Sequence, residues 1–148
     1  MTPTIARSPQ FEDLRKRALE VRQNSYSPYS GHKVGAAILM SDGSIHGGCN
    51  VENSSYGGTL CAERVAVHSA VAAKGPKIRV REVVVATDAT PPWPPCGLCR
   101  QVLSEFQQDT VIHAVNPQGD VQSWRFEDLL PSAFTPSFLA TDTTGSKT

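Results

Sequence analysis

The sequence predicts an α/β domain with a mixed sheet and helices on both of its faces. Short apolar, β-branched segments typical of buried strands alternate along the chain with segments whose apolar residues repeat at helical spacing. The length of 148 residues suits one domain with one core, and 39% apolar and 19% charged residues are typical of a globular protein. We therefore expect one domain over residues 1–148, with mobile tails at 1–10 and about 139–148.

Each element of the first half has a local reason. The first helix follows from apolar residues that share one face, and the strand after it follows from an unbroken apolar run. Ser41-Asp42-Gly43-Ser44 predicts the turn of a hairpin into a second strand. The second helix ends before Gly75-Pro76, and we expect Thr59 to be its N-cap. These four elements are predicted at 11–24, 34–40, 45–50 and 60–74.

The second half of the chain continues the alternation. A strongly β-branched strand is followed by Pro91-Pro92-Trp93-Pro94-Pro95, which forbids regular structure until a helix begins at the second cysteine pair. Two further strands and a short helix then complete the fold. These elements are predicted at 80–87, from 96 onwards, and at 111–115, 121–125 and 126–130. The sheet is therefore expected to have about five strands.

Composition and charge exclude several classes of function. Lys plus Arg equals Asp plus Glu at 14 each, so the chain has no excess positive charge to attract nucleic acid. No apolar run approaches the roughly 20 residues that span a bilayer, and residues 1–10 lack a secretory signal. Four cysteines without such a signal indicate a reducing compartment. We expect a cytoplasmic protein that binds neither nucleic acid nor membrane.

Three cysteines have the spacing of zinc ligands. Cys96 and Cys99 are three apart at the start of a predicted helix, so their side chains share one side. Cys61 precedes Glu63 by two residues, and these two side chains converge only at a helix N-terminus. Three thiols leave the fourth position of a zinc ion open, as in catalytic zinc sites. The spacing therefore predicts one zinc ion beside a glutamate.

The charge of such a site predicts further residues. Three thiolates and one divalent cation sum to minus one, so the site needs a nearby base and compensating positive charge. Glu63 can supply the base. Arg64 and Arg100 each follow a motif residue and can donate hydrogen bonds to ligand sulfurs. We expect Arg64 in this role, with Arg100 as a second candidate.

From Ser27 onwards the chain resembles the cytidine deaminases of the small, all-cysteine type. The cysteine motifs also correspond to the zinc deaminase signature with Cys as first ligand. The resemblance implies a three-layer αβα fold, one zinc ion per chain, and a homotetramer with its sites at subunit boundaries. The matching stretches are Tyr29-Ser30, Val34–Ala37, Asn50–Gly57, Cys61–Arg64, Pro95–Leu103, Leu129–Pro131 and Phe134.

The resemblance also implies a reaction. Cytidine and 2′-deoxycytidine would be hydrolysed to uridine and 2′-deoxyuridine plus ammonia, as in pyrimidine salvage. Zinc held by Cys61, Cys96 and Cys99 would activate the water that attacks C4 of the base. Glu63 would carry protons from this water to N3 and to the leaving amine. The backbone N–H of Ala62 would bind the ring carbonyl.

Four further residues are candidate nucleoside contacts. Asn50 and Glu52 are two apart at the end of a predicted strand, so they share a face, and an amide with a carboxylate suits hydroxyl recognition. The resemblance implies that they hold the ribose 3′-hydroxyl, and the carboxylate disfavours phosphorylated substrates. Phe134 resembles the aromatic that covers the base from a neighbouring subunit. His32 stands where the family usually has Phe, and the 91–95 loop is unusually rich in proline.

Three alternative functions also involve a zinc site. A deaminase of a cytosine-bearing antibiotic such as blasticidin S would keep both cysteine motifs without requiring the Asn50 and Glu52 pair. A polynucleotide-editing deaminase commonly has histidine as its first ligand and a basic surface. A non-enzymatic zinc module, with Cys49 or a histidine as the fourth zinc ligand, would leave Glu63 without a function. The histidines His46, His68 and His113 have no ligand spacing to the cysteines.

Overall fold

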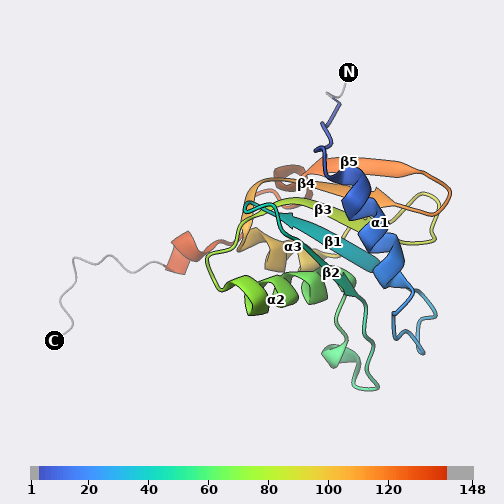
Figure 1. The fold of residues 1–148 in the computed structure, drawn as a ribbon. Coiled ribbons are helices and arrows are strands. Elements are labelled where there is room, and N and C mark those ends of the chain that lie inside the picture. The colour runs from blue at the N-terminus through green and yellow to red at the C-terminus, as the bar shows by residue number, and fades with distance from the viewer. Residues whose placement is uncertain (1–3, 140–148) are drawn as a thin grey trace, which may run out of the picture.

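The computed structural model describes residues 4–139, which form a five-stranded mixed sheet between helices (Figure 1). The strand order is β2-β1-β3-β4-β5. β3 and β4 are parallel, and the other neighbours are antiparallel. The helices and strands are α1 (Phe11–Arg22), β1 (Gly35–Met40), β2 (Ile45–Cys49), α2 (Ala62–Lys74), β3 (Val80–Ala86), α3 (Gly97–Ser104), β4 (Gln107–Val115), β5 (Val121–Arg125) and α4 (Phe126–Leu129).

The α/β class and the three-layer arrangement are confirmed. The helix α1 covers one face of the sheet, while α2 and α3 lie on the other (Figure 1). All five predicted strands are present, although β4 begins at Gln107, four residues before its predicted start. The mobility expected for residues 1–10 and 139–148 stays a prediction, and residues 1–3 and 140–148 lie outside the described part of the chain.

The prediction that Thr59 caps α2 is wrong. The helix begins at Ala62, and Cys61 occupies its N-cap position with extended backbone angles. The reason is a backbone bridge in which Leu60 and Val51 exchange N–H···O bonds of 2.9 and 3.0 Å. This bridge keeps the chain extended through Leu60, so the helix cannot start earlier.

The first layer forms because α1 has one apolar face. Phe11, Leu14 and Ala18 lie three and four residues apart and are fully buried against the sheet. They pack on alternate residues of β1 and β3, such as Leu39 and Val84. This core packs α1 on one face of the sheet and leaves the opposite face for the helices that carry the cysteines.

A glycine sets the distance between α2 and the sheet. A Cβ atom at Gly48 of β2 would lie 2.7 Å from the Ala62 carbonyl oxygen, and it would also clash with the Ala66 backbone nitrogen. Only glycine therefore permits this close approach. The first turn of α2 is held directly over β2, which fixes the position of Cys61 and Glu63.

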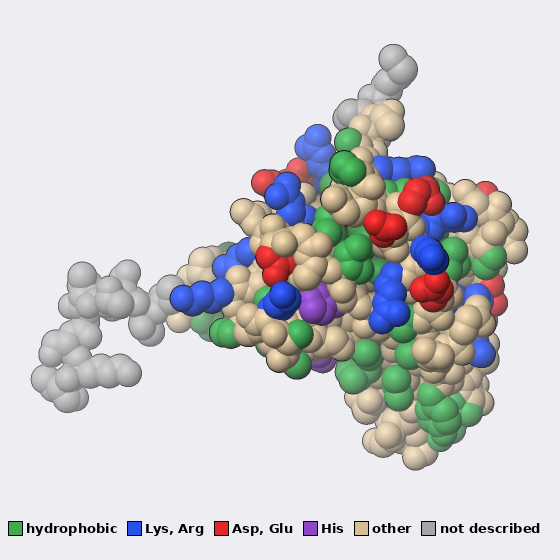
Figure 2. All heavy atoms as spheres, viewed as in Figure 1, with side chains coloured by type: hydrophobic (Ala, Val, Ile, Leu, Met, Phe, Trp, Pro, Cys, Tyr) green, Lys and Arg blue, Asp and Glu red, His purple; other side chains and the backbone are tan. Residues whose placement is uncertain are grey.

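The surface shows no single sign of charge on the face that carries α1. Basic and acidic side chains are interspersed there (Figure 2). Among residues 4–139, no helix combines the length and the apolar character that a membrane crossing requires. The expected absence of nucleic-acid and membrane partners stays a prediction.

A buried polar cluster joins three strands beneath the N-terminal segment. The fully buried ring of His113 lies between Glu82 and Ser123, with Nε2 2.8 Å from Glu82 Oε1 and Nδ1 2.6 Å from Ser123 Oγ. The backbone N–H of Ser8 donates to the same Glu82 oxygen at 3.4 Å. Burial alone would raise the pKa of Glu82, but the hydrogen bonds from His113 and Ser8 hold it below its ordinary value of 4.5.

We expect Glu82→Gln to destabilise the fold in a pH-dependent way. A depressed pKa means that the carboxylate stabilises the native state fully above pH 4.5 and less as the pH falls through the native pKa. The variant should lose about 1–3 kcal/mol of unfolding free energy at pH 7. The difference from the parent chain should narrow below pH 4.5. Urea unfolding at several pH values measures both quantities.

The control for this prediction is Glu12→Gln on the exposed side of α1. It should change the unfolding free energy by less than about 0.5 kcal/mol. If the unfolding free energy of Glu82→Gln stayed below that of the parent chain by a constant amount from pH 7 to pH 3.5, the charge of the carboxylate would contribute nothing to stability.

Candidate active site

Three thiols converge at one end of the sheet. The sulfur atoms of Cys61, Cys96 and Cys99 all lie within 4.8 Å of one another, and those of Cys61 and Cys96 are 3.8 Å apart. In a tetrahedral site with Zn–S bonds of about 2.3 Å, two sulfurs are separated by about 3.8 Å. The donor atoms therefore fit one zinc ion, as the sequence predicts. Within residues 4–139 this cluster includes no fourth His, Cys, Asp or Glu ligand.

The alternative of a closed structural zinc site receives no support from the geometry. Cys49 lies outside the cluster. His113 is held on the α1 side of the sheet by Glu82 and Ser123. The fourth position thus remains available to a non-protein ligand, which is the arrangement of a catalytic zinc site.

Two helix N-termini supply the thiols. Cys61 is the N-cap of α2 and Cys96 is the N-cap of α3, where its sulfur accepts the Cys99 backbone N–H at 3.5 Å. The positive end of each helix dipole favours the thiolate form. The hydrogen bond from the Cys99 thiol, followed by those from Arg64 and Cys96, lowers the pKa of Cys61 to about 5.

Glu63 lies beside the thiols and is nearly inaccessible to solvent. Its side chain is within the first turn of α2, its residue is 3% exposed, and its Oε2 lies 3.7 Å from the Cys99 sulfur. Burial raises the pKa of Glu63 to about 7, and the charge of Cys61 adds to the rise. The carboxyl group can therefore both accept and release a proton near neutral pH.

Of the two candidate arginines, only Arg64 contacts a thiol. Its Nη2 donates to the Cys61 sulfur at 3.5 Å and to the Thr59 carbonyl oxygen at 3.2 Å. Arg100 points away from the thiols, because its guanidinium donates to the carbonyl oxygens of Pro95 and Leu129, both at 2.8 Å. Arg100, the second candidate, therefore does not donate to a ligand sulfur and instead links α3 to the segment before it and to α4.

A cavity of about 150 Å³ opens in front of the thiols. Glu63 and Ala62 form part of its wall beside Cys61 and Cys96, and its lining atoms are mainly apolar. As the first residue of α2, Ala62 has a backbone N–H without a partner inside the helix. A small planar molecule entering this cavity would meet the thiols, a buried carboxyl group and a free backbone donor.

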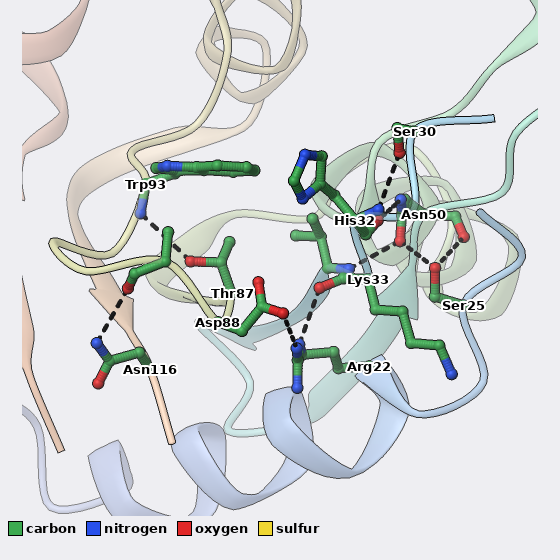
Figure 3. Close-up of polar contacts among 12 residues, drawn as sticks. Arg22, Ser25, Ser30, His32, Lys33, Asn50, Thr87, Asp88, Trp93 and Asn116 are labelled. Carbon is green, nitrogen blue, oxygen red and sulfur yellow. Dashed lines mark hydrogen bonds and ion pairs between the residues drawn. The ribbon is translucent and has the colours of Figure 1, made fainter. Parts of the chain in front are cut away.

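Asn50 lines the same cavity and also organises the loop before β1. Its Oδ1 accepts the Val34 N–H at 2.8 Å and a hydrogen bond from Ser25 Oγ, while its Nδ2 donates to the His32 carbonyl oxygen at 2.8 Å (Figure 3). One N–H of the amide remains for a ligand. The structure thus gives Asn50 a supporting role that the sequence did not indicate.

Glu52 is not among the residues that line this cavity, but it too organises the loop before β1. Its Oε1 accepts the backbone N–H groups of Tyr29 and Ser30 at 2.9 and 3.1 Å, which fixes the loop between α1 and β1. Hydrogen bonds from Ser30 and Tyr29 hold its pKa below the ordinary value. The carboxylate is therefore ionised at neutral pH, with its Oε2 atom left for a donor such as a hydroxyl group.

The two aromatic candidates do not line the cavity of this chain. His32 instead packs edge-on against Trp93, with ring centroids 5.0 Å apart at 74° (Figure 3). Phe134 is 56% exposed and stacks on Phe138, and its carbonyl oxygen accepts a hydrogen bond from Gln101. Their predicted contacts with substrate stay predictions, and that of Phe134 concerns a neighbouring subunit.

Several cavity residues were not singled out from the sequence. Val85 lies near the end of β3 and Thr87 directly follows the strand, while Leu60 precedes α2 and Pro94 belongs to the proline-rich loop. Their residue types are common in cores and turns, so only their position after β3 or beside the cysteine motifs could have indicated them. Trp93, three residues before Cys96, carried the clearest signal because a bulky aromatic in a proline-rich loop is unusual.

The fold and the site together define a zinc-dependent deaminase. The sequence profile of the cytidine and deoxycytidylate deaminase zinc-binding region matches residues 9–115. A curated cytidine deaminase of Halalkalibacterium halodurans is 49% identical over 123 residues, covering 82% of this chain and 92% of that protein. A cytidine deaminase of Mycobacterium tuberculosis is 41% identical over 123 residues, covering 82% and 86%.

The structural comparison gives the same family. The crystal structure of the cytidine deaminase from Burkholderia pseudomallei is similar with a TM-score of 0.78 at 43% identity, covering 83% of this chain and 98% of that chain. The chain therefore belongs to the cytidine and deoxycytidylate deaminase family. The resemblance described from the sequence is confirmed, and the family's zinc-binding character agrees with the three-thiol cluster.

The ligand assignment predicts the zinc content of cysteine variants. Cys96→Ala should reduce the metal from about one zinc per chain to below about a tenth, because two thiols bind zinc weakly. Cys49→Ala should keep the full content, since Cys49 lies outside the cluster. Elemental analysis of the purified proteins measures both. Loss of zinc from Cys49→Ala would contradict the three-ligand site.

Proposed function

We propose that this chain catalyses the hydrolytic deamination of cytidine and 2′-deoxycytidine to uridine and 2′-deoxyuridine, with release of ammonia. The observation that carries the proposal is the buried carboxyl group of Glu63 beside three thiols with an open fourth position. The relatives that are 40–49% identical over most of the chain are named cytidine deaminases, which supports the same reaction.

Each residue at the site has a separate role in the reaction. Cys61, Cys96 and Cys99 would hold the zinc ion, and its chemistry would supply an activated water as the nucleophile. Glu63 accepts a proton from this water and gives it to N3 as the oxygen bonds to C4. It then transfers the remaining hydroxyl proton to the amino group, which leaves as ammonia when its bond to C4 breaks. The N–H of Ala62 holds the ring carbonyl during these steps.

The sugar is held on the side of the cavity that Asn50 lines, with Glu52 two residues further along the chain. C4 and the glycosidic N1 lie at opposite ends of a pyrimidine ring, so a base with C4 at Glu63 directs its sugar away from the thiols. Asn50 then donates its free N–H to a sugar hydroxyl, and Glu52 accepts from one. The charge on Glu52 opposes binding of a nearby phosphate, which favours nucleosides over nucleotides.

We also propose a homotetramer with the cavity at a subunit boundary. Exposed apolar side chains near the C-terminus support association, because isolated surfaces rarely carry several large apolar residues together. Phe134, Phe138 and Leu139 are 56–71% exposed, and Phe134 is the residue proposed to cover the base in a neighbouring subunit. We further propose that the chain acts in pyrimidine salvage in the cytoplasm and that residues 1–148 form one domain.

The antibiotic-deaminase alternative is not favoured. The named relatives at high identity are cytidine deaminases. Asn50 lines the cavity with one amide N–H left for a ligand, which suits the hydroxyl of a ribose. A non-enzymatic zinc module leaves the proximity of Glu63 to the thiols without a function.

The role of Glu63 predicts a separation of metal binding from catalysis. Glu63→Gln preserves the shape of the side chain but cannot accept the proton of the water. We expect zinc content to remain at about one per chain while kcat for cytidine falls by about 10²- to 10⁴-fold. The loss of ultraviolet absorbance during deamination measures the rate. A surface control, Glu127→Gln, should leave kcat unchanged, and near-normal turnover by Glu63→Gln would contradict the proton-transfer role.

The role of Glu52 predicts a change in sugar-dependent affinity. Glu52→Gln keeps an oxygen that accepts the Tyr29 and Ser30 N–H groups, so the loop should stay in place. The lost charge weakens the bond to a hydroxyl, and KM for cytidine should rise about tenfold. Competitive inhibition by uridine should weaken by a similar factor, whereas inhibition by uracil should not. Equal weakening of uridine and uracil would exclude a sugar contact.

A further inference from the structure

The indole of Trp93 is an exposed apolar surface at the mouth of the active-site cavity. It lines the cavity together with Glu63 and Cys96, yet the residue is 43% exposed. A tryptophan usually buries a large apolar area, and an indole left open at a ligand cavity offers that area to a ligand. The catalytic steps described above make no use of this side chain.

The loop that carries Trp93 is held in place before any ligand binds. Its backbone N–H donates to Thr87 Oγ1 at 3.4 Å, and prolines flank it on both sides. The Asn116 side chain donates to the Ala89 carbonyl oxygen at 3.0 Å and to Thr90 Oγ1 at 3.3 Å (Figure 3). Asn116 is itself fully buried and bonded to Asp120. A rigid loop contributes binding surface without an ordering cost.

His32 supports the indole from the side. Its ring meets that of Trp93 at 74° with centroids 5.0 Å apart, which is the preferred edge-to-face arrangement of aromatic pairs. The backbone of His32 is fixed by Asn50, whose Nδ2 donates to its carbonyl oxygen, and by Ser30 Oγ, which accepts its N–H at 3.1 Å. His32 does not line the cavity, so it can influence a bound ligand only through its contact with Trp93.

From these contacts we propose that Trp93 is a substrate-contacting residue and that His32 is a positioning residue acting through it. The inference rests on the proposed function, because the ligand is the nucleoside. With C4 at Glu63, the glycosidic side of the base lies toward the cavity mouth. The indole of Trp93 packs there against the nucleoside, outside the reacting atoms. It therefore contributes to the binding of substrate and transition state alike.

Kinetic constants of four variants test this division of roles. Trp93→Ala should raise KM for cytidine about tenfold and change kcat by less than about threefold, as expected for loss of one aromatic contact. His32→Ala should raise KM by a smaller factor, whereas His32→Phe, which preserves the edge-to-face contact, should behave like the parent chain. In the Trp93→Ala chain, a second substitution His32→Ala should add nothing.

Fluorescence gives a readout that does not depend on turnover. The chain has two tryptophans, and Trp124 on β5 packs into the core away from the cavity. A Trp124→Phe chain therefore reports on Trp93 alone. Uridine, the reaction product, should change its emission saturably, at the concentrations at which it inhibits deamination. A Trp93→Phe chain, which keeps Trp124, is the matched control and should show no change.

The outcomes separate this inference from the proposed function. Active protein in which uridine leaves Trp93 emission unchanged, or in which Trp93→Ala has the parent KM, overturns the inference alone. Protein that does not deaminate cytidine but shows the uridine-dependent emission overturns the proposed reaction and keeps the nucleoside contact. Additive effects of Trp93→Ala and His32→Ala would assign His32 an independent contact and remove its positioning role.

Discussion

The convergence of four acidic groups in one small space is the constraint on which the rest of the structure depends. Three thiols and the carboxyl group of Glu63 repel one another when ionised, so they can share a site only if positive charge compensates them. The fold supplies two helix N-termini and the Arg64 guanidinium, and a zinc ion held by the thiols would supply the remainder. The close approach at Gly48 belongs to the same arrangement, because it brings the first turn of α2 to the sheet. Catalytic geometry and packing are therefore set by the same contacts.

The residues proposed to bind the sugar also stabilise the loop that frames the cavity. Asn50 joins Ser25, His32 and Val34, and Glu52 fixes the N–H groups of two loop residues. Buried polar groups of this kind are costly to leave unpaired, so the free cavity is held in shape by the same amide and carboxylate that a ligand would meet. Because the same two residues shape the loop and are proposed to meet the ligand, a short segment after β2 can determine substrate specificity in a chain of only 148 residues.

Much of the fold and the metal site could be predicted from the sequence, since both depend on local patterns. Apolar and β-branched runs located all five strands, although β4 begins four residues earlier than predicted, and the cysteine spacing placed three thiols together. Two failures near the site, at Thr59 and Arg100, involve contacts with residues outside the cysteine motifs. Thr59 has good capping chemistry, but the bridge to Val51 delays the helix. Arg100 follows a motif residue as Arg64 does, yet its guanidinium donates to the Leu129 carbonyl oxygen instead of a thiol. Neither partner can be identified from the spacing of the motif.

The pairing of His32 with Trp93 shows how two departures from the family pattern can be one structural feature. Taken separately, a histidine at a position usually held by phenylalanine weakens an apolar contact, and a tryptophan in a proline-rich loop adds unexplained bulk. Taken together, the imidazole fills the space beside the larger indole and meets it edge-on. The interaction between two aromatic rings adds stabilisation beyond the contacts that each ring makes separately, and this addition requires both rings. The cavity wall thus keeps its apolar character, while the surface that meets the ligand is supplied by the loop that also carries Cys96.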